Sequence, residues 1–169
     1  HPIKFRGVDE EWQVFEYELL KDKVLKGLIS AKNGYKWGYI HQSPYLVVID
    51  EGNTPADPND DRVILKEPKD YQGQSFARKI YAIEEDRKGN IWIAMDEGIG
   101  VDFDPQRVFD RENYQINRPR ITQEGYTQYI LRDNFITDIA IDPANRIWFA
   151  TQTSGVYVYN SDAQNIDHH

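Results

Sequence analysis

Residues 136–151 read ITDIAIDPANRIWFAT, and the same pattern occurs twice more in the chain. The earlier copies are LKGLISAKNGYKWGYI at residues 25–40 and IYAIEEDRKGNIWIAM at residues 80–95. Each copy carries one tryptophan at the same position, and these recur 55 and 56 residues apart: Trp37, Trp92 and Trp148. A unit that recurs at a nearly constant period indicates a solenoid, a propeller or another repeat array.

Each copy is typical of two strands joined by a tight turn. In the third copy a β-branched run ends before Asp142 and resumes at Ile147. Short apolar runs bounded by Gly, Pro, Asn and Asp predict strand–turn–strand units. Three residues before each tryptophan stands a residue type that tolerates positive φ, which predicts a left-handed turn position: Gly34, Gly89 and Asn145.

A further apolar run follows each tryptophan strand, so we expect three-strand units at about residues 24–49, 79–104 and 135–160. An outer strand from each connecting stretch would complete a four-stranded antiparallel sheet, which is the blade of a β-propeller. The sequence therefore predicts an all-β partial propeller of about three four-stranded blades, a single domain over residues 1–169. Residues 1–22 are expected to add an outer strand or a cap.

The repeated pattern resembles the two-component-regulator propeller repeat, which is common in extracytoplasmic sensor regions of bacterial hybrid histidine kinases. Two stretches narrow the resemblance: GNIWIAMDEGIGVDFDPQRVF at residues 89–109 and YILRDNFITDIAIDPANRIWFATQTSGVYVYNSD at residues 129–162. They are similar to the β-propeller proteins of the type IX (Por) secretion system and their exported homologues. The usual Gly-Thr after the tryptophan strand is replaced in all three copies, and Tyr39-Ile40 makes the first copy the most divergent.

The resemblance implies a non-enzymatic extracytoplasmic region, in the periplasm or at the cell surface of a Gram-negative bacterium. In one hypothesis it is a protein- or carbohydrate-binding scaffold of type IX secretion. In the alternative it is a ligand-binding sensor domain of a hybrid two-component histidine kinase in the periplasm. An enzyme of the propeller lyase type is a weaker alternative. Fold alone does not decide between these functions.

Composition excludes several other classes. The formal net charge is −8 and the isoelectric point is ≈ 5.0, which argues against nucleic acid, because duplex binding rests on clustered Lys and Arg. The absence of cysteine excludes disulfides and thiolate chemistry. No apolar run approaches the ~18 residues of a membrane span. Because no histidine lies in a known catalytic motif, we expect no enzyme and no cofactor.

The number of repeats bears on the partners. Closed propellers carry about four to eight blades, and three copies leave two blade faces without a neighbour. We therefore expect the partners to be other blades or subunits of a larger propeller, with a homodimer through the open blade faces as the alternative. A surface protein or glycan is a further expected partner.

Residues 50–61 form an acidic stretch between two repeats. Its carboxylates are a candidate calcium loop, since Ca²⁺ takes about six to eight oxygen ligands: Asp50, Asp57, Asp60 and Asp61. The spacing does not match an EF-hand loop. We favour a solvated acidic loop and predict no metal site.

The tryptophans have two interpretations. They could form a sugar-stacking platform, but residues that recur at the repeat period are better explained by packing between blades. Trp12 lies outside the repeat position and is the freer candidate for ligand contact.

Overall fold

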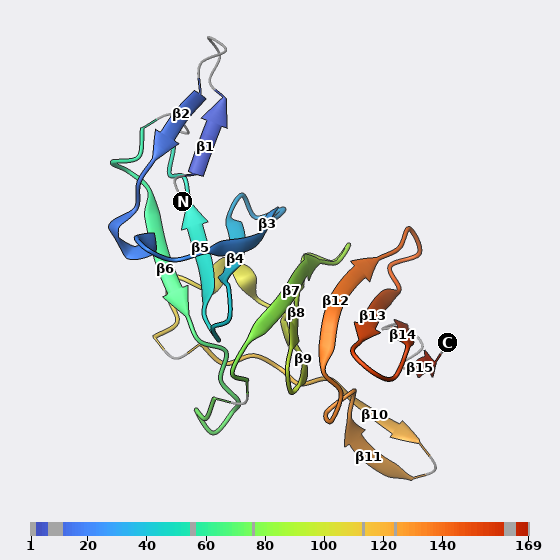
Figure 1. Cartoon of the computed structure of the whole chain (residues 1–169). Helices are drawn as coiled ribbons and strands as arrows, with labels where there is room; N and C mark the ends of the chain where they lie inside the picture. Colours follow the sequence, from blue (N-terminus) through green and yellow to red (C-terminus); the bar gives the residue numbers. More distant parts are fainter. Residues whose placement is uncertain are drawn as a thin grey trace.

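The structure, a computed structural model, describes residues 3–6, 12–54, 57–75, 77–112, 114–123, 125–160 and 165–168. In this part of the chain strands predominate, and the helical elements are two single 3₁₀ turns, η1 (Glu18–Leu20) and η2 (Pro105–Arg107). No described helix is long and apolar enough to span a bilayer. The predicted all-β propeller fold is confirmed (Figure 1).

The three repeats form three antiparallel sheets, side by side as blades (Figure 1). The first blade consists of β3 (Leu25–Ser30), β4 (Lys36–Ile40), β5 (Leu46–Asp50) and β6 (Arg62–Lys66). The middle blade consists of β7 (Ile80–Glu85), β8 (Ile91–Met95) and β9 (Gly98–Asp102). The last blade consists of β12 (Ile136–Ile141), β13 (Ile147–Thr151), β14 (Val156–Asn160) and β15 (Asn165–His168).

The middle blade differs from the expectation, whereas the first blade takes its outer strand from the connecting stretch as expected. The middle blade has three strands, and its fourth position is held by one antiparallel bridge between Val101 and Asn117. The outer strand of the first blade is β6, so residues 1–22 do not supply it. Instead β1 (Ile3–Arg6) pairs with β2 (Trp12–Phe15) as a separate hairpin. A second hairpin, β10 (Arg120–Gln123) with β11 (Tyr126–Tyr129), projects near the last blade.

The turn before each tryptophan has the same backbone geometry. The three turn residues singled out by the sequence all have positive φ: Gly34 (92°), Gly89 (85°) and Asn145 (61°). In the middle blade the carboxylate of Asp86 accepts hydrogen bonds from two turn N–H groups and from Trp92 Nε1 at 3.0 Å. Asp142 makes the same set in the last blade, with Trp148 Nε1 at 3.1 Å. The aspartate six residues before the tryptophan therefore joins the turn to the tryptophan strand by hydrogen bonds.

The first blade lacks this aspartate. Ala31 occupies its position, and Trp37 Nε1 is buried without a hydrogen-bond partner in the described part of the chain. A buried unpaired donor costs about 1–3 kcal/mol. The turn of the first blade instead contacts the turn of the middle blade. Lys32 Nζ donates to the carbonyl oxygens of Asp86 and Arg87 there, at 2.9 and 2.7 Å.

The first two repeat tryptophans each face the next blade in the chain. Trp37 belongs to the apolar cluster between the first and middle blades, and Trp92 to the cluster between the middle and last blades. The Trp92 ring lies 6.0 Å from Phe149 and 5.8 Å from Tyr159, measured between centroids. The side chains of β8 alternate, so Ile91 and Ile93 face the opposite way from Trp92. The middle blade is therefore apolar on both faces.

The connecting segment after β9 fills the space beside the middle blade. Tyr114 and Ile116 are buried in the cluster between the first two blades. Asp102, which is 1% exposed, accepts hydrogen bonds from Tyr114 Oη at 2.8 Å and from Arg111 Nη2 at 2.6 Å. Burial, and then the charge of Asp102, raise the pKa of Tyr114. This buried ion pair fixes the path that the chain takes to the β10–β11 hairpin.

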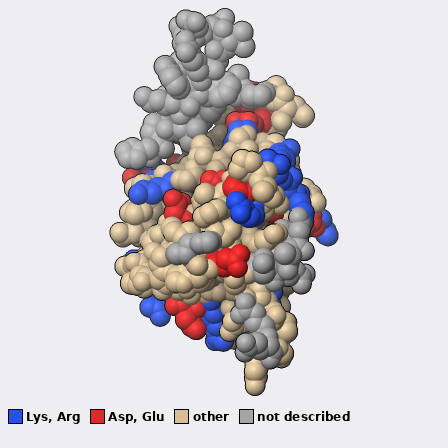
Figure 2. Space-filling model, turned by 90° about the vertical axis from the view of Figure 1, so that its right-hand side faces the viewer, with Lys and Arg blue, Asp and Glu red and all other residues tan. Residues whose placement is uncertain are grey.

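The outer faces of the first and last blades differ in how far they are covered. Leu20 packs with Ile40, Val47 and Ile49, so η1 covers part of the outer face of the first blade. Trp148, on the outer face of the last blade, remains partly exposed, contrary to the expectation that it is largely buried. No described blade lies against this face. Uncharged residues form much of the side of the molecule on which the last blade lies (Figure 2).

We expect unequal losses from two equivalent substitutions. Trp92→Ala removes a ring enclosed by two blades and should lower the free energy of unfolding by about 3–5 kcal/mol. Trp148→Ala should cost roughly half as much, because one side of that ring is open. Urea denaturation of both variants measures the difference, and equal losses would show that the last blade is covered.

A second substitution tests the missing turn aspartate. Ala31→Asp should supply an acceptor to Trp37 Nε1 and raise the free energy of unfolding by about 1 kcal/mol. The matched control is the same change in a Trp37→Phe background, which has no indole N–H. Thermal melts of the four proteins form a double-mutant cycle, and a gain that persists without the indole N–H would contradict this account.

Candidate functional site

In the described part of the acidic stretch between β5 and β6, the candidate carboxylates have separate hydrogen-bond partners. Asp50 pairs with Arg62, whose Nη2 lies 2.6 Å away, and it also accepts the Gly52 N–H. Asp57 accepts the N–H and the side-chain amide of Asn59, at 3.0 and 2.6 Å. Both carboxylates are therefore used within the local turn.

The other two aspartates of the stretch also have separate partners. Asp60 accepts the Asn53 N–H at 3.0 Å, and hydrogen bonds from the Thr54 side chain and from that N–H lower the pKa of Asp60. Asp61 accepts a hydrogen bond from the Tyr17 hydroxyl. Among the described residues, no group of three or more His, Asp or Glu side chains converges as metal ligands would.

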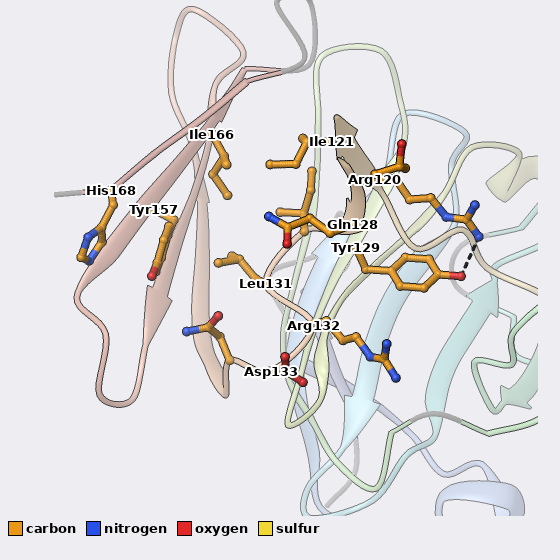
Figure 3. Close-up of a pocket in the computed structure, with 13 residues that line it drawn as sticks. Arg120, Ile121, Gln128, Tyr129, Leu131, Arg132, Asp133, Tyr157, Ile166 and His168 are labelled. Carbon is orange, nitrogen blue, oxygen red and sulfur yellow. Dashed lines mark hydrogen bonds between the residues drawn. The ribbon is translucent and has the colours of Figure 1, made fainter. Parts of the chain in front are cut away.

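A cleft of about 730 Å³ lies between the β10–β11 hairpin and the last blade (Figure 3). The base of the hairpin is held firmly, because Ile121 and Ile130 are buried in the apolar cluster that joins the middle and last blades. The two outermost strands of the last blade face this hairpin across the cleft, and the described part of the middle blade has no regular fourth strand on that side. The cleft occupies the space left between them.

One wall of the cleft comes from β14 and β15. Tyr157 and Ile166 present apolar surface to the cleft from neighbouring strands (Figure 3). The His168 ring stacks on Tyr157, with centroids 4.5 Å apart and planes 23° apart, and a ring nitrogen bonds the Ser154 carbonyl. The stacking gives this wall a flat aromatic surface.

The opposite wall carries positive charge. Arg120 donates to the Tyr129 hydroxyl at 2.6 Å, and its guanidinium lies 4.5 Å from the Tyr129 ring centroid (Figure 3). Arg118 lies 5.0 Å from the same ring and donates to the Glu97 carbonyl. Burial, and then the charge of Arg132, lower the pKa of Arg118. Of the arginines, Arg120 and Arg132 line the cleft together with Asp133, and in Figure 3 the two guanidinium groups point away from β14 and β15.

Polar groups lie between these walls. Gln128 and Leu131 project into the space between the hairpin and the last blade, and Asn134 and Asp133 line it as well (Figure 3). The arrangement combines an aromatic surface, hydrogen-bonding amides and arginines, which suits a polar or anionic ligand of modest size.

Sequence reasoning did not find this cleft. Most of its lining comes from the region between the second and third repeats, and the segment from residue 105 to residue 132 has no periodic pattern. Its signals were the closely spaced arginines and tyrosines around residues 118–132. Of the predicted ligand contacts, the Trp12 side chain lies outside the described part of the structure, and Trp37 and Trp92 are packing residues.

Comparison with known proteins agrees with the fold. Residues 75–97 and 130–153 match the family model described as two component regulator propeller. These segments cover the tryptophan strands of the middle and last blades. No curated protein sequence gives a match.

Solved structures with the same fold come from several kinds of protein. PorZ, described as a surface component of the type IX secretion system of Porphyromonas gingivalis, has a TM-score of 0.83 and 24% identity over 95% of this chain. The extracellular domain of a one-component system of B. thetaiotaomicron has a TM-score of 0.58 and 19% identity over 97% of this chain. Virginiamycin B lyase from Staphylococcus aureus has a TM-score of 0.60 and 16% identity over 99% of this chain.

The chain spans only part of each of these proteins: 23% of the PorZ chain, 21% of the extracellular domain and 47% of the lyase.

We expect the acidic stretch to be indifferent to calcium. Its carboxylates already accept hydrogen bonds from separate neighbours, so binding one ion would require several of these bonds to break. Thermal melts in excess Ca²⁺ and in chelator should coincide, because only a ligand of the native state raises the midpoint. A rise in midpoint that is lost in the variant carrying Asp57→Asn, Asp60→Asn and Asp61→Asn would contradict this.

Proposed function

We propose that this chain is an extracytoplasmic propeller region that acts as a non-enzymatic scaffold in type IX secretion and binds a protein or glycan at the cleft beside the β10–β11 hairpin. The observation that carries the proposal is the likeness to PorZ over 95% of the chain, at a TM-score of 0.83. The cleft supports it, because irregular segments on a rigid β scaffold commonly carry binding sites.

The proposal also concerns what covers the open outer face of the last blade. The face of Trp148 repeats the arrangement by which Trp37 and Trp92 each contact the following blade. A further blade of a larger propeller, or a second copy of this chain, would cover it in the scaffold. In either case the scaffold is held together by the same aromatic contact between blades.

A sensor region of a hybrid two-component histidine kinase is the second candidate. The observation that favours it is the repeat itself, since two segments match the two component regulator propeller. The cleft would then bind a small ligand in the periplasm. The lyase likeness favours an enzyme less, because the described histidines are placed unlike catalytic groups: His41 is exposed after β4, and His168 stacks on Tyr157.

The experiment is to fill the cleft in the bacterium that carries the gene. Gln128→Trp places a large ring between the two walls, and Gln106→Trp is the matched control at an exposed position outside the cleft. For a scaffold, Gln128→Trp should lower the amount of type IX cargo at the cell surface, and a tenfold weaker affinity for the partner corresponds to about 1.4 kcal/mol. Loss of a transcriptional response to oligosaccharide, with cargo unchanged, would favour the sensor. No effect of either kind would overturn the role of the cleft.

A further inference from the structure

The hairpin strand β11 offers an unpaired edge. It pairs only with β10, so one side of its backbone has no strand beside it in the described sheets. The consecutive residues Thr127, Gln128 and Tyr129 all line the cleft. Successive side chains of a strand point to opposite faces, and Gln128 and Tyr129 do so in Figure 3. The cleft also touches Arg120 and Ile121 of β10, so it lies against both strands of the hairpin and includes the residues of the β11 edge.

The hydrogen-bond alternation identifies which backbone groups face outward. The Ile130 N–H donates to the Pro119 carbonyl at 2.9 Å, toward β10. In an antiparallel pair the inward groups alternate along the strand, so Gln128 also bonds toward β10. The N–H and C=O groups of Thr127 and Tyr129 then point away from it. The 2.8 Å contact between the Thr122 and Thr127 hydroxyls agrees, because side chains approach more closely at a non-hydrogen-bonded pair.

The side chains around this edge determine what can bind there. Leu131 and Ile166 offer apolar contact, and Tyr157 adds the aromatic surface. Arg132 is exposed on the cleft and forms no hydrogen bond or ion pair within the described part of the chain. The guanidinium groups of Arg118 and Arg120 lie over the ring of Tyr129. The positive charge of this wall complements a carboxylate.

We propose that the cleft binds an extended acidic peptide, which adds to β11 as a further antiparallel or parallel strand. The backbone groups of Thr127 and Tyr129 hydrogen-bond the peptide backbone. Alternate aliphatic side chains of the peptide lie against Leu131 and Ile166, and a peptide carboxylate pairs with Arg132. This inference rests on the proposed binding role of the cleft and states the chemical class of its partner.

A random library of eight-residue peptides, displayed on phage and selected on the immobilised whole chain, tests the inference without a known ligand. Selected peptides should be enriched in Asp or Glu among alternating aliphatic residues. Arg132→Glu should weaken their binding by about tenfold, as expected for the loss of one charge-assisted contact. Arg107→Glu, at an exposed arginine outside the cleft, is the matched control and should leave binding unchanged.

Backbone addition has its own readout. In a complex with a selected peptide, the Thr127 and Tyr129 amides should become protected from hydrogen exchange. Methylation of alternate peptide nitrogens should abolish binding in one register and spare it in the other. Equal tolerance of both methylated registers, or no enrichment of acidic peptides over the Arg132→Glu protein, would overturn the inference.

A separate titration distinguishes peptide binding from the more general proposal that the cleft is a binding site. Oligogalacturonate, an acidic oligosaccharide, is titrated into the wild-type and Gln128→Trp proteins. Saccharide binding that is lost in Gln128→Trp, together with failure of the peptides, would overturn the peptide inference and leave the cleft as a glycan site. Failure of both probes would count against the cleft as a binding site altogether.

Discussion

Face-to-face packing between blades is the constraint on which the rest of the structure depends. A propeller blade is too thin to bury its own apolar side chains, so each sheet is stable only with a neighbour on each face. Trp92 meets this requirement by placing its ring against Phe149 and Tyr159 of the next blade. The turn aspartate fixes the ring by accepting its N–H, which joins local turn geometry to packing between blades.

The same constraint explains where the molecule departs from regularity. Among the described sheets none packs on the outer face of the first blade, and η1 covers part of that face with Leu20. None of them packs on the outer face of the last blade either, and Trp148 stays partly exposed. The middle blade lacks a regular fourth strand, so the hairpin that occupies that region leaves a cleft against β14 and β15. The candidate binding site is thus a consequence of incomplete packing between blades.

The repeats made most of the fold predictable from sequence. A period of 55 or 56 residues, the glycine or asparagine before each tryptophan and the apolar runs are local signals, and the strands lie where these signals place them. The cleft was not predictable in this way. It depends on the Asp102–Arg111 pair, which directs the connecting segment, and on the close approach of distant strands. Composition also does not reveal the partners of the acidic stretch, where Asp50 pairs with Arg62 and Asp61 accepts a hydrogen bond from Tyr17.

Native-state hydrogen exchange, resolved by residue, tests most directly the claim that stability follows the number of neighbours of each blade. Exchange from the most protected amides reports the free energy of opening of each structural unit. The account predicts that β7–β9, packed on both faces, exchange most slowly, and that β12–β14, with one open face, exchange faster by about tenfold or more. Protection of β12–β14 equal to that of β7–β9 in the monomeric chain would contradict it.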